Sequence, residues 1–194
     1  MIWAVVLAAG RSRRMGTQKL LLPFAGSTVL GHIVDQLAGS SVAGTLVVVG
    51  PEHADIQAAL TGRPIRFAAN PAVESEMLDS LRCGLRALPE DCRGFLVCLG
   101  DQPGISPELV GALMEAFESA GGGVVAPLHA GRRGHPVLIG MEHRDRILAQ
   151  YDDVGLRGLL RDPEVRVTEV PWRESLEDLD SPEDYRRAVG TAGA

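Results

Sequence analysis

Up to about residue 127, short apolar runs alternate with segments of helical periodicity. The runs contain few polar positions, which predicts strands buried on both faces of a sheet. They cover residues 2–7, 45–49, 65–68, 95–99 and 124–126. The intervening segments repeat apolar residues at helical spacing over residues 29–37, 51–60, 75–88 and 106–119. This alternation predicts an α/β protein, a three-layer α/β/α sandwich with a mostly parallel sheet.

Capping residues mark where three of the helices begin. Thr28 precedes the helix predicted over residues 29–37, and its hydroxyl can accept a hydrogen bond from a free N–H of the first turn. Ser106 and Ser181 are each followed by Pro and Glu, which favour the first turn of a helix. We therefore expect helices to start directly after these three residues.

The chain after residue 128 departs from the regular alternation. It contains a predicted strand over 134–139, short helices near 144–150 and 155–160, a strand over 165–170 and the helix after Ser181. We interpret this part as a region appended to the first sheet. A chain of 194 residues suits one domain with a substantial core. The prediction is therefore a single domain, 1–194, with parts 1–127 and 128–194.

Charge and cysteine usage narrow the class of protein. The formal net charge of −6 does not favour a nucleic-acid partner. Cys83, Cys92 and Cys98 are an odd set without a CxxC pair, which favours a reduced, cytoplasmic protein over a disulfide framework or a zinc site. The apolar run 2–7 is too short to span a bilayer and has no basic flank, so we expect no membrane partner.

A basic loop follows the first predicted strand. After Ala8, Ala9 and Gly10 come three Arg and one Lys up to Lys19, with no acid among them. Free backbone N–H groups and clustered cations suit a polyphosphate such as a nucleoside triphosphate. The alternative is a surface loop with solvated Arg, but α/β folds place ligands directly after buried strands. Neither GxxxxGK[ST] nor GxGxxG is present.

Asp101 follows the strand predicted over residues 95–99. A carboxylate at that end of a parallel sheet is well placed to hold Mg²⁺, which prefers oxygen ligands. The alternative is an aspartate that only caps the following turn. Because a triphosphate arrives with Mg²⁺ and the ion needs a protein anchor, the basic loop favours the metal site.

Residues 7–19, LAAGRSRRMGTQK, resemble the LAAGxSxRMGxxK signature of the MobA-like nucleotidyltransferases. Within that group the chain is similar to molybdenum-cofactor cytidylyltransferases. The resemblance continues through GDQP at 100–103, GRRGHPV at 131–137 and DLDSPEDY at 178–185. It implies a Rossmann-like fold of the nucleotide-diphospho-sugar transferase type, in which residues 1–127 bind the nucleotide and 128–194 bind the acceptor.

The resemblance also implies roles for single residues. Arg14 and Lys19 are the motif cations, which would act in catalysis together with Asp101, and Asp180 would complete the Mg²⁺ site. The alternative for Asp180 is that it only caps the last helix. The implied nucleotide-binding residues are Leu7, Ala8, Ala9, Gly10, Arg14, Lys19, Asn70, Ser80 and Asp101.

Two further segments resemble the family less closely. Asn70 and the stretch 76–81 resemble NP…GMxxSL, which borders the base, but Glu76 stands where the pattern has Gly. Ser80 has the alternative of being a polar residue on an apolar helix. Arg133, Gly134 and His135 match the segment that faces the acceptor. The alternative for His135 is a purely structural hydrogen bond.

The implied reaction is Mg²⁺-dependent transfer of CMP from CTP to the molybdopterin/molybdenum cofactor, with release of pyrophosphate. A molybdoenzyme that receives the cofactor is a further implied partner. A phosphate monoester is already ionised near neutral pH, since its second pKa is ~6, and needs no general base. Three alternatives stay open: a transferase using GTP or another phosphorylated acceptor, an NAD(P)H-dependent reductase of the nicotine blue oxidoreductase type, and a protein that hands on a cofactor without chemistry.

Overall fold

The computed structural model describes residues 1–10, 19–72, 76–174 and 176–192. Within these, the strands are β1 (Ile2–Ala8), β2 (Pro23–Phe24), β3 (Ser27–Thr28), β4 (Gly44–Val49), β5 (Ile65–Ala69), β6 (Gly94–Leu99), β7 (Val124–His129), β8 (Arg132–Arg133), β9 (Val137–Gly140) and β10 (Val167–Pro171). The helices are α1 (Val29–Ala38), α2 (Ala54–Ala59), α3 (Met77–Ala87), α4 (Pro107–Ala120), α5 (Arg144–Ala149), α6 (Arg157–Arg161) and α7 (Pro182–Ala192), with short 3₁₀ turns η1 (Lys19–Leu21) and η2 (Met141–His143).

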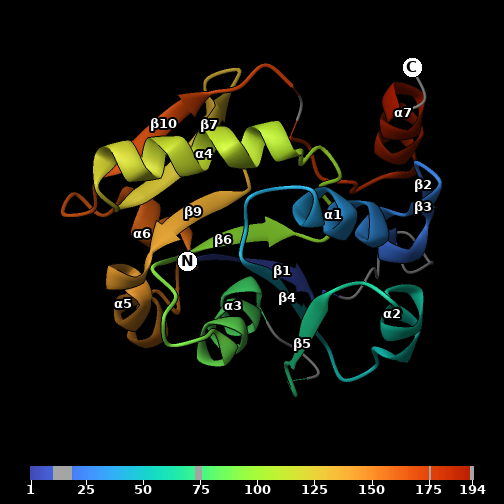
Figure 1. Ribbon diagram of the computed structural model, residues 1–194, viewed down its shortest axis with the longest axis horizontal. Coiled ribbons are helices and arrows are strands. Elements are labelled where there is room, and N and C mark those ends of the chain that lie inside the picture. Colours follow the sequence, from blue (N-terminus) through green and yellow to red (C-terminus); the bar gives the residue numbers. More distant parts are fainter. Residues whose placement is uncertain (11–18, 73–75, 175, 193–194) are drawn as a thin grey trace.

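The main sheet has the strand order β10-β7-β9-β6-β1-β4-β5, with β8 paired to β7 (Figure 1). β1 runs parallel to both β4 and β6, β4 to β5, and β10 to β7. Among the described strands of this sheet, only β9 and the short β8 run against the others, while β2 and β3 form a separate antiparallel pair. The mostly parallel α/β sheet predicted from the alternation is therefore confirmed.

The strand β9 corrects one expectation about the second part of the chain. It lies inside the sheet, between β6 and β7, and is not appended beside it. Its four residues are all buried, because β6 and β7 pair with its two edges and the two cores cover its faces. The strand expected over 134–139 begins only at Val137, because Gly134 turns back to donate its N–H to the Pro127 carbonyl at 3.0 Å.

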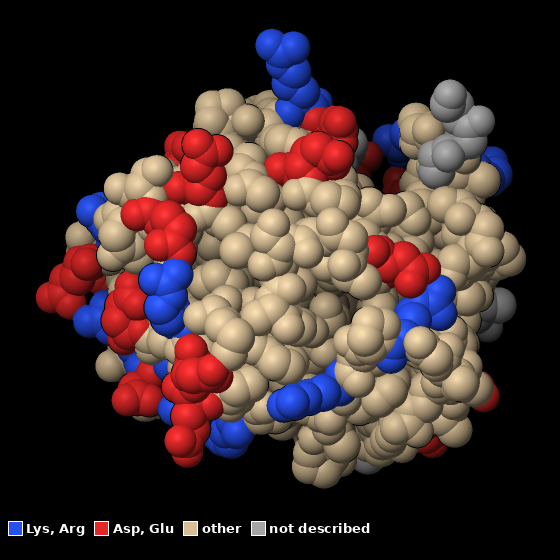
Figure 2. All heavy atoms as spheres, viewed as in Figure 1, with Lys and Arg blue, Asp and Glu red and all other residues tan. Residues whose placement is uncertain are grey.

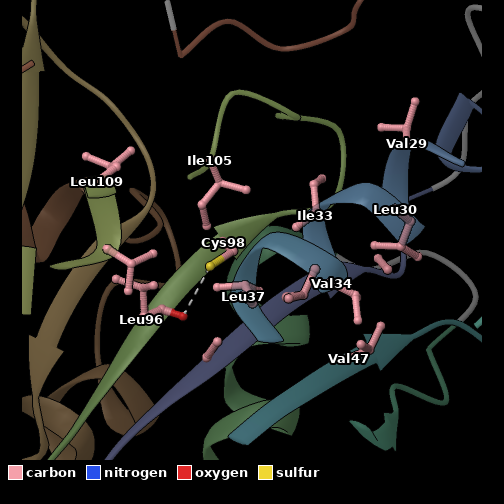
Figure 3. Packing of buried hydrophobic residues seen from close by; sticks show 14 of the residues in the cluster. Val29, Leu30, Ile33, Val34, Leu37, Val47, Leu96, Cys98, Ile105 and Leu109 are labelled. Atoms are coloured by element: carbon pink, nitrogen blue, oxygen red, sulfur yellow. Dashed lines mark hydrogen bonds between the residues drawn. The ribbon is translucent and has the colours of Figure 1, made fainter. Parts of the chain in front are cut away.

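Alternate residues of β1 supply two separate cores. Ala4 and Val6 pack in the cluster that contains α1 and α4, whereas Val5 packs in the cluster that contains α3, α5 and α6. Figure 3 shows the first cluster, in which the apolar side chains of α1 lie over Val47 of β4 and Cys98 of β6. Helices thus cover both faces of the sheet, as the unbroken apolar strands predict.

The predicted helix starts are confirmed by their hydrogen bonds. Thr28 Oγ1 accepts from the Gly31 N–H at 3.0 Å, and Ser106 Oγ accepts from the Leu109 N–H at 3.2 Å. Ser181 Oγ accepts from the Asp184 N–H at 3.2 Å at the start of α7. The β2–β3 hairpin has no counterpart in the predicted elements, because its strands are too short for a periodic signal.

Gly100 allows the ends of β6 and β1 to approach closely. Its N–H donates to the Leu7 carbonyl oxygen at 3.0 Å, and a Cβ at this position would lie 2.9 Å from that same oxygen. The residues after the two strands, Ala9 and Gly10 on one side and Asp101 on the other, are therefore neighbours at one edge of the sheet.

Charged side chains of both signs are interspersed around the face shown in Figure 2, and its middle is largely uncharged. Among the described residues, no helix combines the length and the apolar character needed to cross a membrane.

Candidate active site

Three segments far apart in the sequence meet at Lys19, which opens η1 after the basic loop. Its Nζ lies 2.5 Å from Oδ2 of Asp101, directly after β6, and 3.3 Å from Oδ1 of Asp180, just before α7. The structure thus brings together three of the side chains singled out in the sequence. Arg14, with residues 11–18, lies outside the described residues.

Burial and the neighbouring carboxylates shift the pKa of Lys19 in opposite directions. Its side chain is 17% exposed and that of Asp101 is 22% exposed. Burial lowers the pKa of Lys19, but the hydrogen bond and the charge of Asp101, followed by those of Asp180, outweigh burial and raise the pKa above its ordinary value. The ammonium is therefore protonated at neutral pH and faces two carboxylates, an arrangement that can exchange acidic partners for phosphate oxygens.

The small residues at the end of β1 border this site through their backbone. Leu7 and Ala8 belong to the strand, and the Leu7 carbonyl is engaged by Gly100. Ala9 is half-buried and Gly10 is exposed, and no atom of the described residues lies within 4 Å of the position that a Cβ on Gly10 would take.

Two bonds join the segment after β6 to the segment before α7. The Leu179 N–H donates to the Asp101 carbonyl at 3.0 Å, and the Gln102 Nε2 donates to Asp178 Oδ1. Burial raises the pKa of the Asp178 carboxyl; the Gln102 bond opposes this, and the charges of Asp101 and Asp180 add to it. Sequence reasoning missed Gln102 and gave Asp178 little weight, although both stand inside motifs that it used.

The two carboxylates around Lys19 suit a hard divalent cation. Among the described residues, no group of three or more His, Cys, Asp or Glu side chains is arranged to hold a metal ion. Asp101 and Asp180 would therefore be the protein ligands, with water and phosphate oxygens completing the coordination, as is typical of Mg²⁺. The donor set fits the predicted Mg²⁺ site.

Asn70 and Ser80 are buried and bonded to each other. They are 2% and 5% exposed, and Asn70 Nδ2 donates to Ser80 Oγ at 3.1 Å. Asn70 Oδ1 also accepts from the Ala72 N–H at 3.1 Å. The pair joins the end of β5 to α3, which corresponds to the structural alternative for Ser80; a nucleotide contact by either side chain stays a prediction.

The three residues expected to face the acceptor differ in their surroundings. Arg133 is already engaged: its Nε donates to Glu169 Oε1 at 2.7 Å and its Nη1 to the Leu160 carbonyl at 2.9 Å. Gly134 packs closely against Leu176, whose Cδ1 would lie 3.0 Å from a Cβ on the glycine.

His135 is neutral at physiological pH. Burial lowers its pKa to about 4, with the Asp101 charge opposing and the Arg157 charge adding to that effect. Its buried Nε2 has no hydrogen-bond partner among the described residues, and its ring lines a cavity of about 10 Å³ together with Gln102. A cavity of this size holds about one water molecule. His135 can therefore donate or accept a hydrogen bond near Asp101 but carries no charge there.

Relatives of known sequence cover nearly the whole chain. A profile of the MobA-like NTP transferase domain matches residues 4–169. The 2-C-methyl-D-erythritol 4-phosphate cytidylyltransferase of Stenotrophomonas maltophilia is 32% identical over 199 residues, which are 98% of this chain and 76% of the relative. The purine catabolism protein PucB of Bacillus subtilis is 29% identical over 207 residues, 95% of this chain and 96% of the relative.

Solved structures share the architecture. Rv0371c of Mycobacterium tuberculosis H37Rv in complex with manganese superposes with a TM-score of 0.84 at 25% identity, covering 98% of each chain. A nucleotidyl transferase from Methanothermobacter superposes with a TM-score of 0.85 at 28% identity, covering 99% of this chain and 97% of the other. With the profile spanning most of its length and a cytidylyltransferase among its relatives, the chain belongs to the MobA-like NTP transferase family and is a nucleotidyltransferase.

Proposed function

We propose that this protein is a Mg²⁺-dependent cytidylyltransferase that transfers CMP from CTP to the phosphate of the molybdopterin/molybdenum cofactor and releases pyrophosphate. The observation that carries the proposal is the position of Lys19 between Asp101 and Asp180, directly after the basic loop. Relatedness to a cytidylyltransferase supports CTP as the donor. The LAAGxSxRMGxxK resemblance supports molybdopterin as the acceptor.

The reaction is a substitution at the α-phosphorus of CTP. An oxygen of the acceptor phosphate forms a bond to that phosphorus, and the bond from it to the oxygen bridging the α- and β-phosphates breaks. Pyrophosphate leaves with the bonding electrons. No proton has to be removed from the nucleophile, because a phosphate monoester with a second pKa of ~6 is ionised at neutral pH.

The charged side chains of the site have two roles in the proposed reaction: the cations bind the triphosphate, and the carboxylates bind the metal ion. Lys19 and Arg14 would bind the triphosphate, because neutralising and orienting phosphates is the main contribution of a protein to such transfers. Asp101 and Asp180 would hold Mg²⁺, which when bound supplies positive charge to the phosphate oxygens. The manganese complex of a relative supports a divalent ion.

The acceptor would lie beside His135, which is close enough to Asp101 to feel its charge, and would extend toward Arg133. A neutral His135 can hydrogen-bond either a phosphate or a pterin. Arg133 would have to release Glu169 before it bound a ligand.

The three thiols form no disulfide among the described residues, which supports the cytoplasmic location proposed for the protein.

Turnover with each nucleoside triphosphate tests the proposal. The protein is incubated with Mg²⁺, molybdopterin carrying molybdenum, and CTP, GTP, ATP or UTP in turn, and released pyrophosphate is measured. Release with CTP and acceptor together, and not with either alone, is expected. Preference for GTP would overturn the cytidylyl assignment, and CTP turnover only with other phosphorylated acceptors would overturn molybdopterin. Binding of NADPH without any pyrophosphate release would favour a reductase.

A further inference from the structure

Gln102 and Asp178 stand beside the two acids of the site without being part of it. Gln102 follows Asp101 directly, and Asp178 lies two residues before Asp180. The Gln102 Nε2 donates to Asp178 Oδ1, so this bond joins two segments that are 76 residues apart in the sequence. We call it the Gln102–Asp178 bridge.

The Gln102–Asp178 bridge lies among carboxylates that repel one another. Asp101, Asp178 and Asp180 gather around one ammonium, that of Lys19, so these four groups carry more negative than positive charge. Asp180 is 62% exposed, and its contact with Lys19 spans 3.3 Å. Without a further constraint, repulsion and side-chain freedom would let Asp180 move away from Asp101.

The fold keeps the two segments together even without the bridge. Leu179 is 2% exposed in the core that contains α1, and its N–H donates to the Asp101 carbonyl at 3.0 Å. Loss of the side-chain bridge would therefore leave the fold in place and loosen only the local spacing of the two segments that carry Asp101 and Asp180.

We propose that Gln102 and Asp178 are positioning residues, whose hydrogen bond sets the spacing of the Asp101 and Asp180 carboxylates for a divalent cation. In this role neither residue would itself be a ligand of the ion. The bridge joins the two segments that carry the ligands and does not bond to the ligands themselves; by comparison, loss of a partner bonded directly to a ligand typically weakens metal binding by about 10- to 100-fold. The inference rests on the proposed function, because it takes Asp101 and Asp180 to be metal ligands.

Mn²⁺ binding by the full chain, followed by electron paramagnetic resonance of free Mn²⁺, tests the bridge without any turnover. Gln102→Leu removes the donor and Asp178→Ala removes the acceptor, and each should weaken Mn²⁺ binding by about 10-fold. Asp178→Asn keeps an acceptor oxygen for Gln102 and should stay within about 3-fold of the unmodified protein. The matched control is Glu177→Gln, an acid next to Asp178 that pairs with Arg187 at 3.3 Å and should leave binding unchanged.

The outcomes separate the bridge from the metal site itself. If Asp101→Asn abolishes Mn²⁺ binding while Gln102→Leu leaves it intact, the bridge has no positioning role. If Asp178→Asn binds as weakly as Asp178→Ala, the carboxylate charge matters and not the hydrogen bond, which also overturns the inference. If Asp101→Asn binds Mn²⁺ normally, the proposed metal site and the inference built on it both fail. Thermal unfolding of each variant verifies that the fold is retained.

Discussion

At the scale of single residues, the site is a balance of one ammonium against several carboxylates. Lys19 lies between Asp101 and Asp180, and its pKa is raised by both although burial lowers it. In the proposed function these groups have different partners when substrate is bound. The ammonium binds phosphate oxygens, and the two carboxylates bind the metal ion. Substitutions of Lys19 and Asp101 should therefore have different kinetic effects.

Asp101→Asn should lower kcat by about 100-fold or more, because the substitution removes a charged metal ligand that acts on the developing charge of the transition state. The free energy of unfolding should change by no more than about 1 kcal/mol, because Lys19 keeps its ion pair with the exposed Asp180. Steady-state pyrophosphate release and urea unfolding measure the two quantities. Substantial residual turnover would contradict a metal role for Asp101.

Lys19→Ala should weaken CTP binding by about 10- to 100-fold, because a hydrogen bond to a charged group contributes ~1.5–3 kcal/mol. Binding of the acceptor should change by less than about 3-fold, because the proposed acceptor position lies beyond direct contact with the ammonium and solvent ions screen the charge over that distance. Calorimetry with each substrate measures both. Arg93→Ala, which removes a cation paired with Glu118 before β6 begins, is the control. A larger loss for the acceptor than for CTP would show that the loop serves the acceptor.

His135 makes stability depend on pH. Its pKa is about 4 in the folded chain, below the ordinary 6.5, so the unfolded chain takes up a proton first as pH falls. The contribution of the neutral His135 to the free energy of unfolding is therefore fully present above pH 6.5 and is lost as the pH falls from 6.5 to about 4. Between pH 7 and pH 5 the loss should be at most about 2 kcal/mol larger for the unmodified protein than for His135→Gln. Urea unfolding at both pH values measures it; equal losses would show that the imidazole is not buried neutral.

At the scale of elements, glycines decide how closely a helix packs on the sheet. Gly84 of α3 faces β1 and β4, where a Cβ would lie 2.7 Å from Val5 Cγ1 and 3.0 Å from Val48 Cγ2. Both are β-branched side chains with little freedom to move. Gly111 of α4 differs, because open space surrounds the position of its missing Cβ.

The two glycines should respond in opposite directions to the same substitution. Gly84→Ala should destabilise the fold by about 1–3 kcal/mol through overpacking, despite the better helix propensity of alanine. Gly111→Ala should stabilise it by about 0.5–1 kcal/mol, because only the propensity changes. Chemical denaturation of both variants measures the difference. Similar effects at the two positions would mean that α3 does not lie tightly on the sheet.

At the scale of the whole molecule, the site exists because the sheet and the C-terminal segment bring three chain segments to one edge. β1 and β6 are parallel neighbours, so Ala9 and Gly10 leave the sheet beside Asp101. The segment before α7 then returns over that edge and carries Asp180 to Lys19. A ligand that contacts all three segments should therefore stabilise the entire fold.

CTP with Mg²⁺ at 100 times its dissociation constant should raise the free energy of unfolding by ~2.7 kcal/mol, since only the folded chain binds it. Thermal unfolding with CTP, with Mg²⁺ and with both together measures the effect. The combined effect should disappear in Asp180→Asn if that carboxylate holds the ion. An equal shift with CTP alone would argue against a metal-dependent site.

Local sequence information was sufficient for most of the elements, and it singled out Lys19 and Asp101, which the structure places together. Apolar periodicity predicts the strands and helices, and the hydroxyls of Thr28, Ser106 and Ser181 mark helix starts because capping involves only neighbouring residues. The placement of a basic loop and of Asp101 directly after buried strands is also a local property. It allowed their proximity to be predicted once a parallel sheet was assumed.

Only the tertiary structure decided which distant residues become partners. The insertion of β9 between β6 and β7, the Gln102–Asp178 bridge, and the pairing of Arg133 with Glu169 all join residues far apart in the chain. Their free energies depend on burial and on charges from other segments, which no sequence window contains. The sequence by itself thus determined the elements and the chemistry available at their ends, whereas long-range packing decided which of these side chains meet.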